Sequence, residues 1–315
     1  MTAPAAVLDV RGQRWRLFVR GVRTFARRYA SRADGVVGLA ILLVFAVMAI
    51  APELLVGPLE TATRATGDAF DPPSAAHIFG ADDLGRDMLN RTIHGARISM
   101  TIGLLATLIT VVLGTLVGVV AGYAGGRVDS VLMRVSDFFL VLPTFVLAII
   151  LAPVIIEVVG IDAEVLGIRA SLLVIIVVIG ITSWATTARI IRSQVLSLKE
   201  RMFVDRARVI GAGPGRIMVR HILPNVLNLI VAQAVLTFAT AVFTETTLSF
   251  IGLGDPFQPS WGELLNSAQT SGAPGLGAWW YIAPPAVSVV LVVLAFTLVG
   301  NALDDLLNPK SASRR

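Results

Sequence analysis

The chain has 315 residues, of which 55% are hydrophobic and only 15% are charged, and its mean hydropathy is +0.79. Soluble domains carry about 25% charged residues, so this composition excludes an ordinary soluble protein and indicates an integral membrane protein. The absence of cysteine from the sequence excludes disulfides and thiolate metal sites, and the distribution of the +5 net charge explains it better than nucleic-acid binding does.

Six apolar runs of 16 to 24 residues are candidates to cross the roughly 30 Å hydrocarbon core of a bilayer as helices. They lack the alternation and the shorter length of transmembrane strands, and a backbone in lipid must satisfy its own hydrogen bonds. We therefore predict an all-α membrane protein with six transmembrane helices. The runs are Gly35–Ile50, Ile98–Ala121, Phe138–Ile156, Ala170–Ala188, Val226–Thr244 and Trp280–Leu303.

Basic residues gather in alternate segments between these runs. Of the 26 Lys and Arg residues, 21 lie in the two tails and in the segments 122–137 and 189–225. Cytoplasmic loops carry the excess of Lys and Arg, so we predict that both termini are cytoplasmic. The predicted parts are a cytoplasmic Arg-rich tail (1–34), a first transmembrane helix (35–52), an extracytoplasmic segment (53–97), a transmembrane core (98–305) with a cytoplasmic loop (189–225) and an extracytoplasmic loop (251–281), and a cytoplasmic tail (306–315).

The two long extracytoplasmic segments are acidic and rich in turn-forming residues. The second of them carries Trp261, Trp279 and Trp280, and tryptophan suits the membrane interface. Anchoring is therefore the favoured interpretation of these side chains. The alternative is a lip that touches a soluble partner.

Motifs for catalysis or metal binding are missing from the sequence. It contains neither a GxxxxGK[ST] phosphate-binding loop nor an HExxH motif, and its three histidines are isolated. A metal site needs clustered ligands. We therefore expect no catalytic residues, no metal site and no cofactor in this chain.

Two features of the apolar runs are candidates for gating or packing. Glu245 lies at the outer end of the fifth run, where an acidic residue is a functional candidate by default. Neighbouring hydroxyl groups could form hydrogen bonds with the Glu245 carboxylate, so a structural or gating role is favoured over direct contact with a substrate. Ser249 and Phe250 are further candidates for the gate or the substrate path. Three glycines at four-residue spacing form the small-xxx-small pattern that allows close helix packing, namely Gly114, Gly118 and Gly122.

The most informative stretch is the basic segment Phe203–Asn225 between two apolar runs. Asp205 near a helix start complements the helix dipole, and Gly211 with Gly213-Pro214-Gly215 permits a sharp turn. Leu223-Pro224 is expected to end one helix and start the next. The pattern predicts a short helix, a bend and a second helix along the membrane surface, and the alternative is an ordinary basic loop that binds anionic lipid.

This segment resembles the EAA loop of binding-protein-dependent ABC importer permeases, which reads E-A-A, three residues, G, nine residues and I-x-L-P. Asp205-Arg206-Ala207 takes the E-A-A places, Gly211 the Gly, His221 the Ile and Leu223-Pro224 the L-P. Asp in place of Glu keeps the charge. Arg206 replaces the first Ala and changes the packing surface of the turn, and His221 removes an apolar contact.

Three further segments are similar to the C-type permease subunit of dipeptide, oligopeptide and nickel importers. They are FGADDLGRDMLNRTIHGARISMTIGL at 79–104, ETTLSFIGLG with PSWGELL at 245–265, and VLAFTLVGNALDDLLNPK at 293–310. They follow the family's order, although Gly300-Asn301 stands where the family usually has Gly-Asp. The resemblance implies a type I ABC importer permease fold in a bacterial cytoplasmic (inner) membrane.

The resemblance also implies a set of partners. The chain would form a heterodimer with a B-type permease subunit, and would work with two cytoplasmic ABC ATPase subunits and an extracytoplasmic solute-binding protein. ATP and Mg would bind to the ATPase subunits, whose closure would pull on a coupling helix at 203–217 and open the bundle outward. The lipid bilayer and a peptide substrate complete the expected partners, and nucleic acid is not among them.

Residue roles follow from the same resemblance. ATPase coupling is implied for Val204, Asp205, Arg206, Ala207, Gly211, Ala212, Arg216, His221, Leu223 and Pro224. Contact with the binding protein is implied for Asp82, Asp83, Arg86, Asp87 and Trp261.

The expected function is thus the permease subunit of an ATP-driven, binding-protein-dependent importer, most simply for di- or oligopeptides. Nickel or another small solute is the alternative substrate. A stand-alone secondary transporter or channel would need coupling-ion sites or broken helices at mid-membrane, of which the apolar runs offer little. A scaffold that recruits cytoplasmic proteins through the basic loop is the third possibility.

Overall fold

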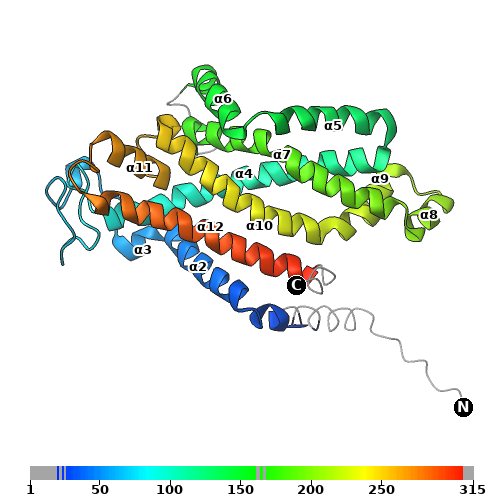
Figure 1. Ribbon diagram of the computed structural model, residues 1–315, viewed down its shortest axis with the longest axis horizontal. Coiled ribbons are helices and arrows are strands. Elements are labelled where there is room, and N and C mark those ends of the chain that lie inside the picture. The colour runs from blue at the N-terminus through cyan, green and yellow to red at the C-terminus, as the bar shows by residue number, and fades with distance from the viewer. Residues whose placement is uncertain (1–19, 21–22, 25, 161–163, 166–167, 308–315) are drawn as a thin grey trace, which may run out of the picture.

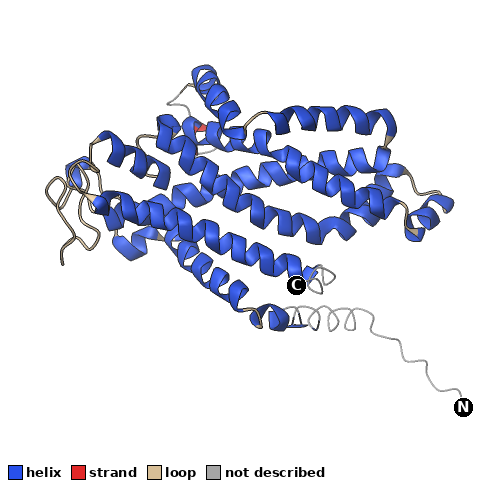
Figure 2. Cartoon of the chain, in the orientation of Figure 1, coloured by secondary structure: helices blue, strands red, loops and turns tan. Residues whose placement is uncertain are grey.

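The computed structural model describes residues 20, 23–24, 26–160, 164–165 and 168–307, and this part of the chain is mostly helical, with loops gathered at one end (Figure 2). Within it, five helical segments are long and apolar enough to cross a membrane. They are α2 (Ala33–Ile50), α4 (Met88–Ala124), α7 (Ala170–Lys199), the continuous run Pro214–Leu253, and α12 (Trp279–Leu307). The last four of these lie side by side along the long axis of the molecule (Figure 1).

The predicted third span is not one straight helix. Its residues belong to α5 (Gly126–Val141) and α6 (Thr144–Val159), which meet at a bend of 94°. Leu142 at the bend is extended, with φ −79° and ψ 127°, because a following proline disfavours helical backbone and Pro143 is next. The single helix predicted over 138–156 is therefore corrected, and the described residues contain a sixth span only if the bent pair crosses as one unit.

Short elements lie at the two ends of the bundle. One end carries α3 (Pro52–Val56), η1 (Ala62–Arg64), η3 (Ser249–Leu253) and α11 (Trp261–Thr270), together with the paired two-residue strands β1 (Glu164–Val165) and β2 (Ile168–Arg169). The other end carries α8 (Met202–Val209), α9 (Pro214–Ile217) and the π-helical turn η2 (Met218–Ile222), which leads into α10 (Leu223–Leu248). Figure 1 shows α3 and α11 at one end of the long axis and α8 and α9 at the other.

The most extensive helix packing is between α4 and α7. The three glycines at four-residue spacing lie at this contact. A Cβ atom at Gly118 would lie 2.6 Å from the carbonyl oxygen of Ala188, and one at Gly114 would lie 2.6 Å from Cβ of Thr187. These distances are too short for any larger residue, so the glycines set how closely the two backbones approach.

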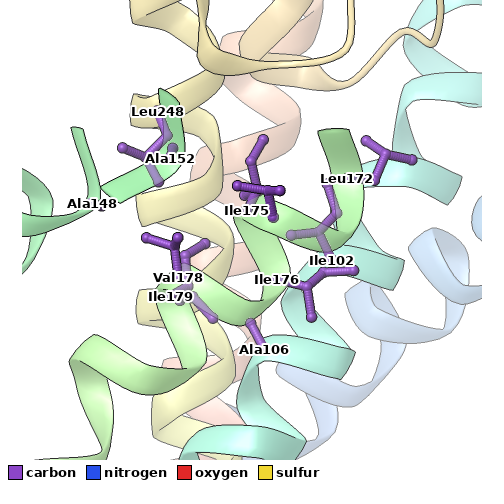
Figure 3. Close-up of a cluster of buried hydrophobic side chains, with 12 residues drawn as sticks. Ile102, Ala106, Ala148, Ala152, Leu172, Ile175, Ile176, Val178, Ile179 and Leu248 are labelled. Atoms are coloured by element: carbon purple, nitrogen blue, oxygen red, sulfur yellow. The ribbon is translucent and has the colours of Figure 1, made fainter. Parts of the chain in front are cut away.

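One part of the core forms where α4, α6, α7 and α10 meet, near the end of the bundle that carries η3 and α11. Figure 3 shows buried aliphatic side chains from all four helices, including Ile102 of α4, Ala152 of α6, Ile175 of α7 and Leu248 of α10. At the opposite end of the bundle, Arg32 before α2 and Asp305 in α12 form an ion pair of 2.6 Å. The first and last long helices therefore begin and end at the same end of the bundle, and the side of the membrane on which that end lies stays a prediction.

Candidate functional site

Residues 202–217 form a compact turn at one end of the bundle, which we call the elbow. Gly211 has φ +84°, a left-handed conformation that glycine adopts without a steric penalty. The N–H groups of Gly211 and Ala212 donate to the carbonyls of Arg208 and Ala207, both at 2.9 Å. These two bonds form a Schellman motif, so α8 ends at the glycine where the sequence predicts the bend.

The elbow has one face in the core and one face exposed. Val204 and Ala207 of α8 are buried in a cluster with residues of α4, α7 and α10. Met202, Val209 and Ile210 are instead 73%, 87% and 82% exposed. Apolar side chains that gather on an exposed surface commonly mark a contact with another protein or with the membrane.

The charged side chains of the elbow also lie at its surface. Asp205 is exposed and accepts a hydrogen bond of 3.0 Å from Arg208, a neighbour on the same helix. Arg206 and Arg216 are exposed as well. The substitution of Arg for the first Ala of the EAA pattern therefore places a cation on the surface of the elbow and does not disturb its buried face.

The second half of the predicted coupling segment differs from the expectation. From Pro214 the chain continues through η2 into α10 as one helical run, and it forms no separate surface helix. Pro224 lacks the backbone N–H that would donate to the carbonyl four residues earlier. It lies just after the π-helical turn, which is wider than an α-helical turn. Asn225 also donates from its side chain to the carbonyl of His221 at 2.6 Å. Leu223-Pro224 therefore widens a helix instead of ending one, which corrects that prediction.

At the opposite end, a charged network ties the loop before α4 to α11. Asp82 is completely buried and accepts hydrogen bonds from the N–H groups of Leu84 and Arg86, both at 2.9 Å, and from Nε of Arg86 at 2.6 Å. Arg91 lies 3.5 Å from Asp82 and 3.2 Å from Glu263 of α11. Burial raises the pKa of Glu263, and the positive charge of Arg91 opposes that rise.

Several residues expected to contact a binding protein have internal roles in this conformation. Asp82 and Trp261 are completely buried, and the indole of Trp261 donates to the carbonyl of Thr92 at 3.0 Å. Asp87 accepts hydrogen bonds from two backbone N–H groups in the first turn of α4 and so caps that helix. Asp83, Arg86 and Asp87 are the half-buried members of the group, so they alone retain some surface for a partner.

Glu245 is completely buried near the C-terminal end of α10. It accepts a hydrogen bond of 2.9 Å from Ser249 and one of 3.5 Å from Thr246. Both hydroxyls belong to the same helical run as Glu245, and they bond its carboxylate within the protein. This favours the structural or gating role over direct contact with a substrate.

Two cavities lie along α7 and α10, and we name them inner and outer after the predicted orientation of the chain. The inner cavity has a volume of about 340 Å³. Its polar lining consists of Thr182, Ser183, Thr186 and Thr187 from α7, and of Gln233, Thr237, Thr240 and Thr244 from α10. This lining was not predicted from the sequence, although steps of four, three and four residues place the α10 members on one face of a helix.

The outer cavity has a volume of about 620 Å³ and is bordered by the loop before α4, by α6, by η3 and by α11. Its charged lining residues are Asp83, Arg86, Arg91, Glu157 and Glu263. Thr244 of the inner cavity and Ser249 of the outer cavity are five residues apart on the α10–η3 helix, or about 7.5 Å at 1.5 Å per residue. The two cavities are therefore consecutive along this helix.

Comparison with known proteins places this geometry in a family. Residues 114–313 match the family described as "Binding-protein-dependent transport system inner membrane component". The dipeptide transport system permease protein DppC of Bacillus subtilis (strain 168) is 38% identical over 288 residues, which cover 90% of this chain and 84% of that protein. The oligopeptide transport system permease protein OppC of the same organism is 36% identical over 285 residues, which cover 90% of this chain and 88% of that protein.

The architecture is also similar to a solved structure. The match is to the structure described as inward facing conformations of the MetNI methionine ABC transporter, with a TM-score of 0.54 and 19% sequence identity. It covers 70% of this chain and 97% of that chain. At this level of identity the likeness shows a common fold alone.

Proposed function

This chain belongs to the family of binding-protein-dependent transport system inner membrane components, and on that premise we propose that it imports di- or oligopeptides as half of a heterodimeric permease. As a family member it is a multi-pass, non-catalytic permease subunit of an inner-membrane ABC transporter that works with an ATPase and a binding protein. The relatives described above are named for dipeptide and oligopeptide transport, which favours peptide as the substrate.

The observation that carries this proposal is the two-faced elbow. A segment that is fixed in the core through Val204 and Ala207, while Val209 and Ile210 are more than four-fifths exposed, is suited to transmit a partner's motion into the bundle. We assign the exposed face to one of two ABC ATPase subunits. The B-type permease subunit would supply the other half of the path, and a solute-binding protein would deliver peptide at the outer end.

The inner cavity supports peptide over nickel as the substrate. Nickel is bound by imidazole, carboxylate or thiolate ligands, and the residues that line this cavity include none of these. Hydroxyl and amide side chains can instead donate to and accept from the peptide groups of any sequence. We propose that the threonine-rich faces of α7 and α10 form this chain's share of the translocation path.

Reconstitution tests the proposal. The chain is co-expressed with a second permease subunit and two ATPases, the complex is placed in proteoliposomes with its binding protein, and uptake of labelled dialanine is measured. Uptake that requires both ATP and the binding protein is the expected result. Uptake by the lone chain without ATP would instead indicate a secondary transporter or channel, and binding-protein-dependent uptake of nickel but not of dialanine would overturn the substrate assignment.

A further inference from the structure

Some of the charged side chains that line the outer cavity have hydrogen-bonding atoms without a described partner in the protein. Asp83 accepts a hydrogen bond of 2.9 Å from Tyr281, and Glu263 is paired with Arg91 and accepts a bond of 2.6 Å from Ser267. These two carboxylates are therefore already held by the protein. The other three charged side chains of the lining are Arg86, Arg91 and Glu157. Each of them has hydrogen-bonding atoms that the described contacts do not use.

Two of these groups are guanidinium groups. Arg91 is only 4% exposed, and its Nε has no hydrogen-bond partner within the described part of the chain. A buried donor without a partner is costly, by about 1–3 kcal/mol. Arg86 contacts Asp82 through Nε, and the contacts described for Arg86 do not use its two terminal nitrogens. A guanidinium group presents donors in a planar fork that matches a carboxylate.

The third group is a carboxylate on another wall of the cavity. Glu157 lies near the end of α6 and is exposed, and it takes part in none of the hydrogen bonds or ion pairs of the described residues. The loop before α4 and the start of α4 thus present two guanidinium groups with unused donors, next to the already bonded carboxylate of Asp83, and α6 contributes a carboxylate without a described partner. A free peptide carries the complementary charges, an ammonium at one end and a carboxylate at the other.

Size and position fit the same ligand. A volume of about 620 Å³ lies within the roughly 300–1,000 Å³ of typical small-molecule pockets. Ser249, which lines the outer cavity, is five residues from Thr244 of the inner cavity. A ligand in the outer cavity therefore lies next to the proposed path. Resting on the proposed peptide-import function, we infer that the outer cavity is a reception site for a short zwitterionic peptide, with Arg86 and Arg91 binding its carboxylate and Glu157 its ammonium group.

Binding is measured on the assembled complex in lipid nanodiscs without its binding protein, so that the permease alone discriminates between ligands. The probes are dialanine, dialanine amide, which lacks the carboxylate, and N-acetyl-dialanine, which lacks the ammonium. Saturation-transfer NMR detects such weak ligands. Dialanine should bind about tenfold more tightly than either blocked probe, the size of one charge-assisted hydrogen bond.

Two variants test which wall of the cavity binds each end of the peptide ligand. Arg86→Gln should weaken dialanine and N-acetyl-dialanine about tenfold and leave dialanine amide unchanged, whereas Glu157→Gln should weaken dialanine and dialanine amide and leave N-acetyl-dialanine unchanged. Arg64→Gln removes an exposed arginine outside the cavity and is the matched control. Glu157→Gln alters no described contact, so its result stands even if changes in the arginine network impair folding.

Two outcomes would overturn the reception site. One is equal binding of all three probes to the wild-type complex, and the other is the same probe pattern in Arg86→Gln, Glu157→Gln and Arg64→Gln. Either result would leave the charged network with a purely structural role. ATP-dependent uptake of dialanine by the wild-type complex is scored separately, so the reception site can fail while the importer function holds, and the reverse.

Discussion

Gly211 offers a test of the elbow with a single methyl group. Its φ is +84°, and no heavy atom of the described residues lies within 4 Å of the position that a Cβ would take. Gly213 is equally open, but its φ is −69°. Gly211→Ala and Gly213→Ala therefore add the same methyl group to open space in the same loop, and they differ in the backbone conformation that the alanine must adopt.

The expected size of the effect follows from that difference. An L-residue in the left-handed region costs roughly 1–2 kcal/mol, and alanine recovers about 0.4–1 kcal/mol by restricting the unfolded chain. The net cost of Gly211→Ala is about 1 kcal/mol, which reduces the population of the native turn about fivefold relative to rearranged turns. Gly213→Ala carries no such strain and should be neutral or slightly stabilising.

The assay compares peptide uptake and ATP hydrolysis in the same proteoliposomes. We expect Gly211→Ala to lower the uptake of dialanine per ATP hydrolysed by up to about fivefold, because a displaced elbow would no longer transmit the ATPase motion. Gly211→Val should lower it further, since a β-branched side chain tolerates positive φ poorly. Equal ratios for Gly211→Ala and Gly213→Ala, at equal amounts of assembled complex, would refute the requirement for a left-handed turn.

Three further predictions concern packing and docking. Gly118→Ala places its Cβ 2.6 Å from a backbone carbonyl of α7, so overpacking of about 1–3 kcal/mol should lower the Tm of the purified protein, unlike Gly215→Ala, where nothing lies within 4 Å. Asp205→Lys should reduce the amount of ATPase that co-purifies, and an unchanged yield would show that the carboxylate does not seat the partner. Trp261→Ala should lower the free energy of unfolding by about 3–5 kcal/mol, and so lower the unfolding temperature in detergent. Trp279→Ala removes a side chain that is 63% exposed, and this variant should unfold at nearly the wild-type temperature.

Local sequence signals account for most of the helices and for the turn of the elbow. The apolar runs are long, and a glycine that ends a helix acts through its own φ angle, so neither depends on distant residues. The break between α5 and α6 has a local cause as well, at Pro143, but the apolar run continues across it and conceals it. Hydropathy measures whether a segment can lie in lipid, and it does not report whether the segment is straight.

The charged network between the loop before α4 and α11 could not be predicted from local patterns, because its contacts join distant parts of the chain. Arg91 and Glu263, which form one of its ion pairs, are 172 residues apart. The resemblance suggested a partner contact for Asp82, whereas burial and four hydrogen bonds or ion pairs give it an internal role. Gly85, with φ +75° and a backbone oxygen 2.1 Å from where its Cβ would lie, is fixed in the same turn by close packing.

The elbow and the outer cavity lie at opposite ends of the bundle, so their coupling requires an element that spans it. The buried face of the elbow packs against Val119 of α4, Ile191 of α7 and Val226 of α10. Protein interiors are close-packed, so a displaced elbow would move these three helix ends together. α4 then runs for 37 residues, about 55 Å at 1.5 Å per residue, and Arg91 lies in its first turn. A tilt of this one helix, without any relay of side chains, would carry motion from the proposed ATPase contact to the proposed reception site.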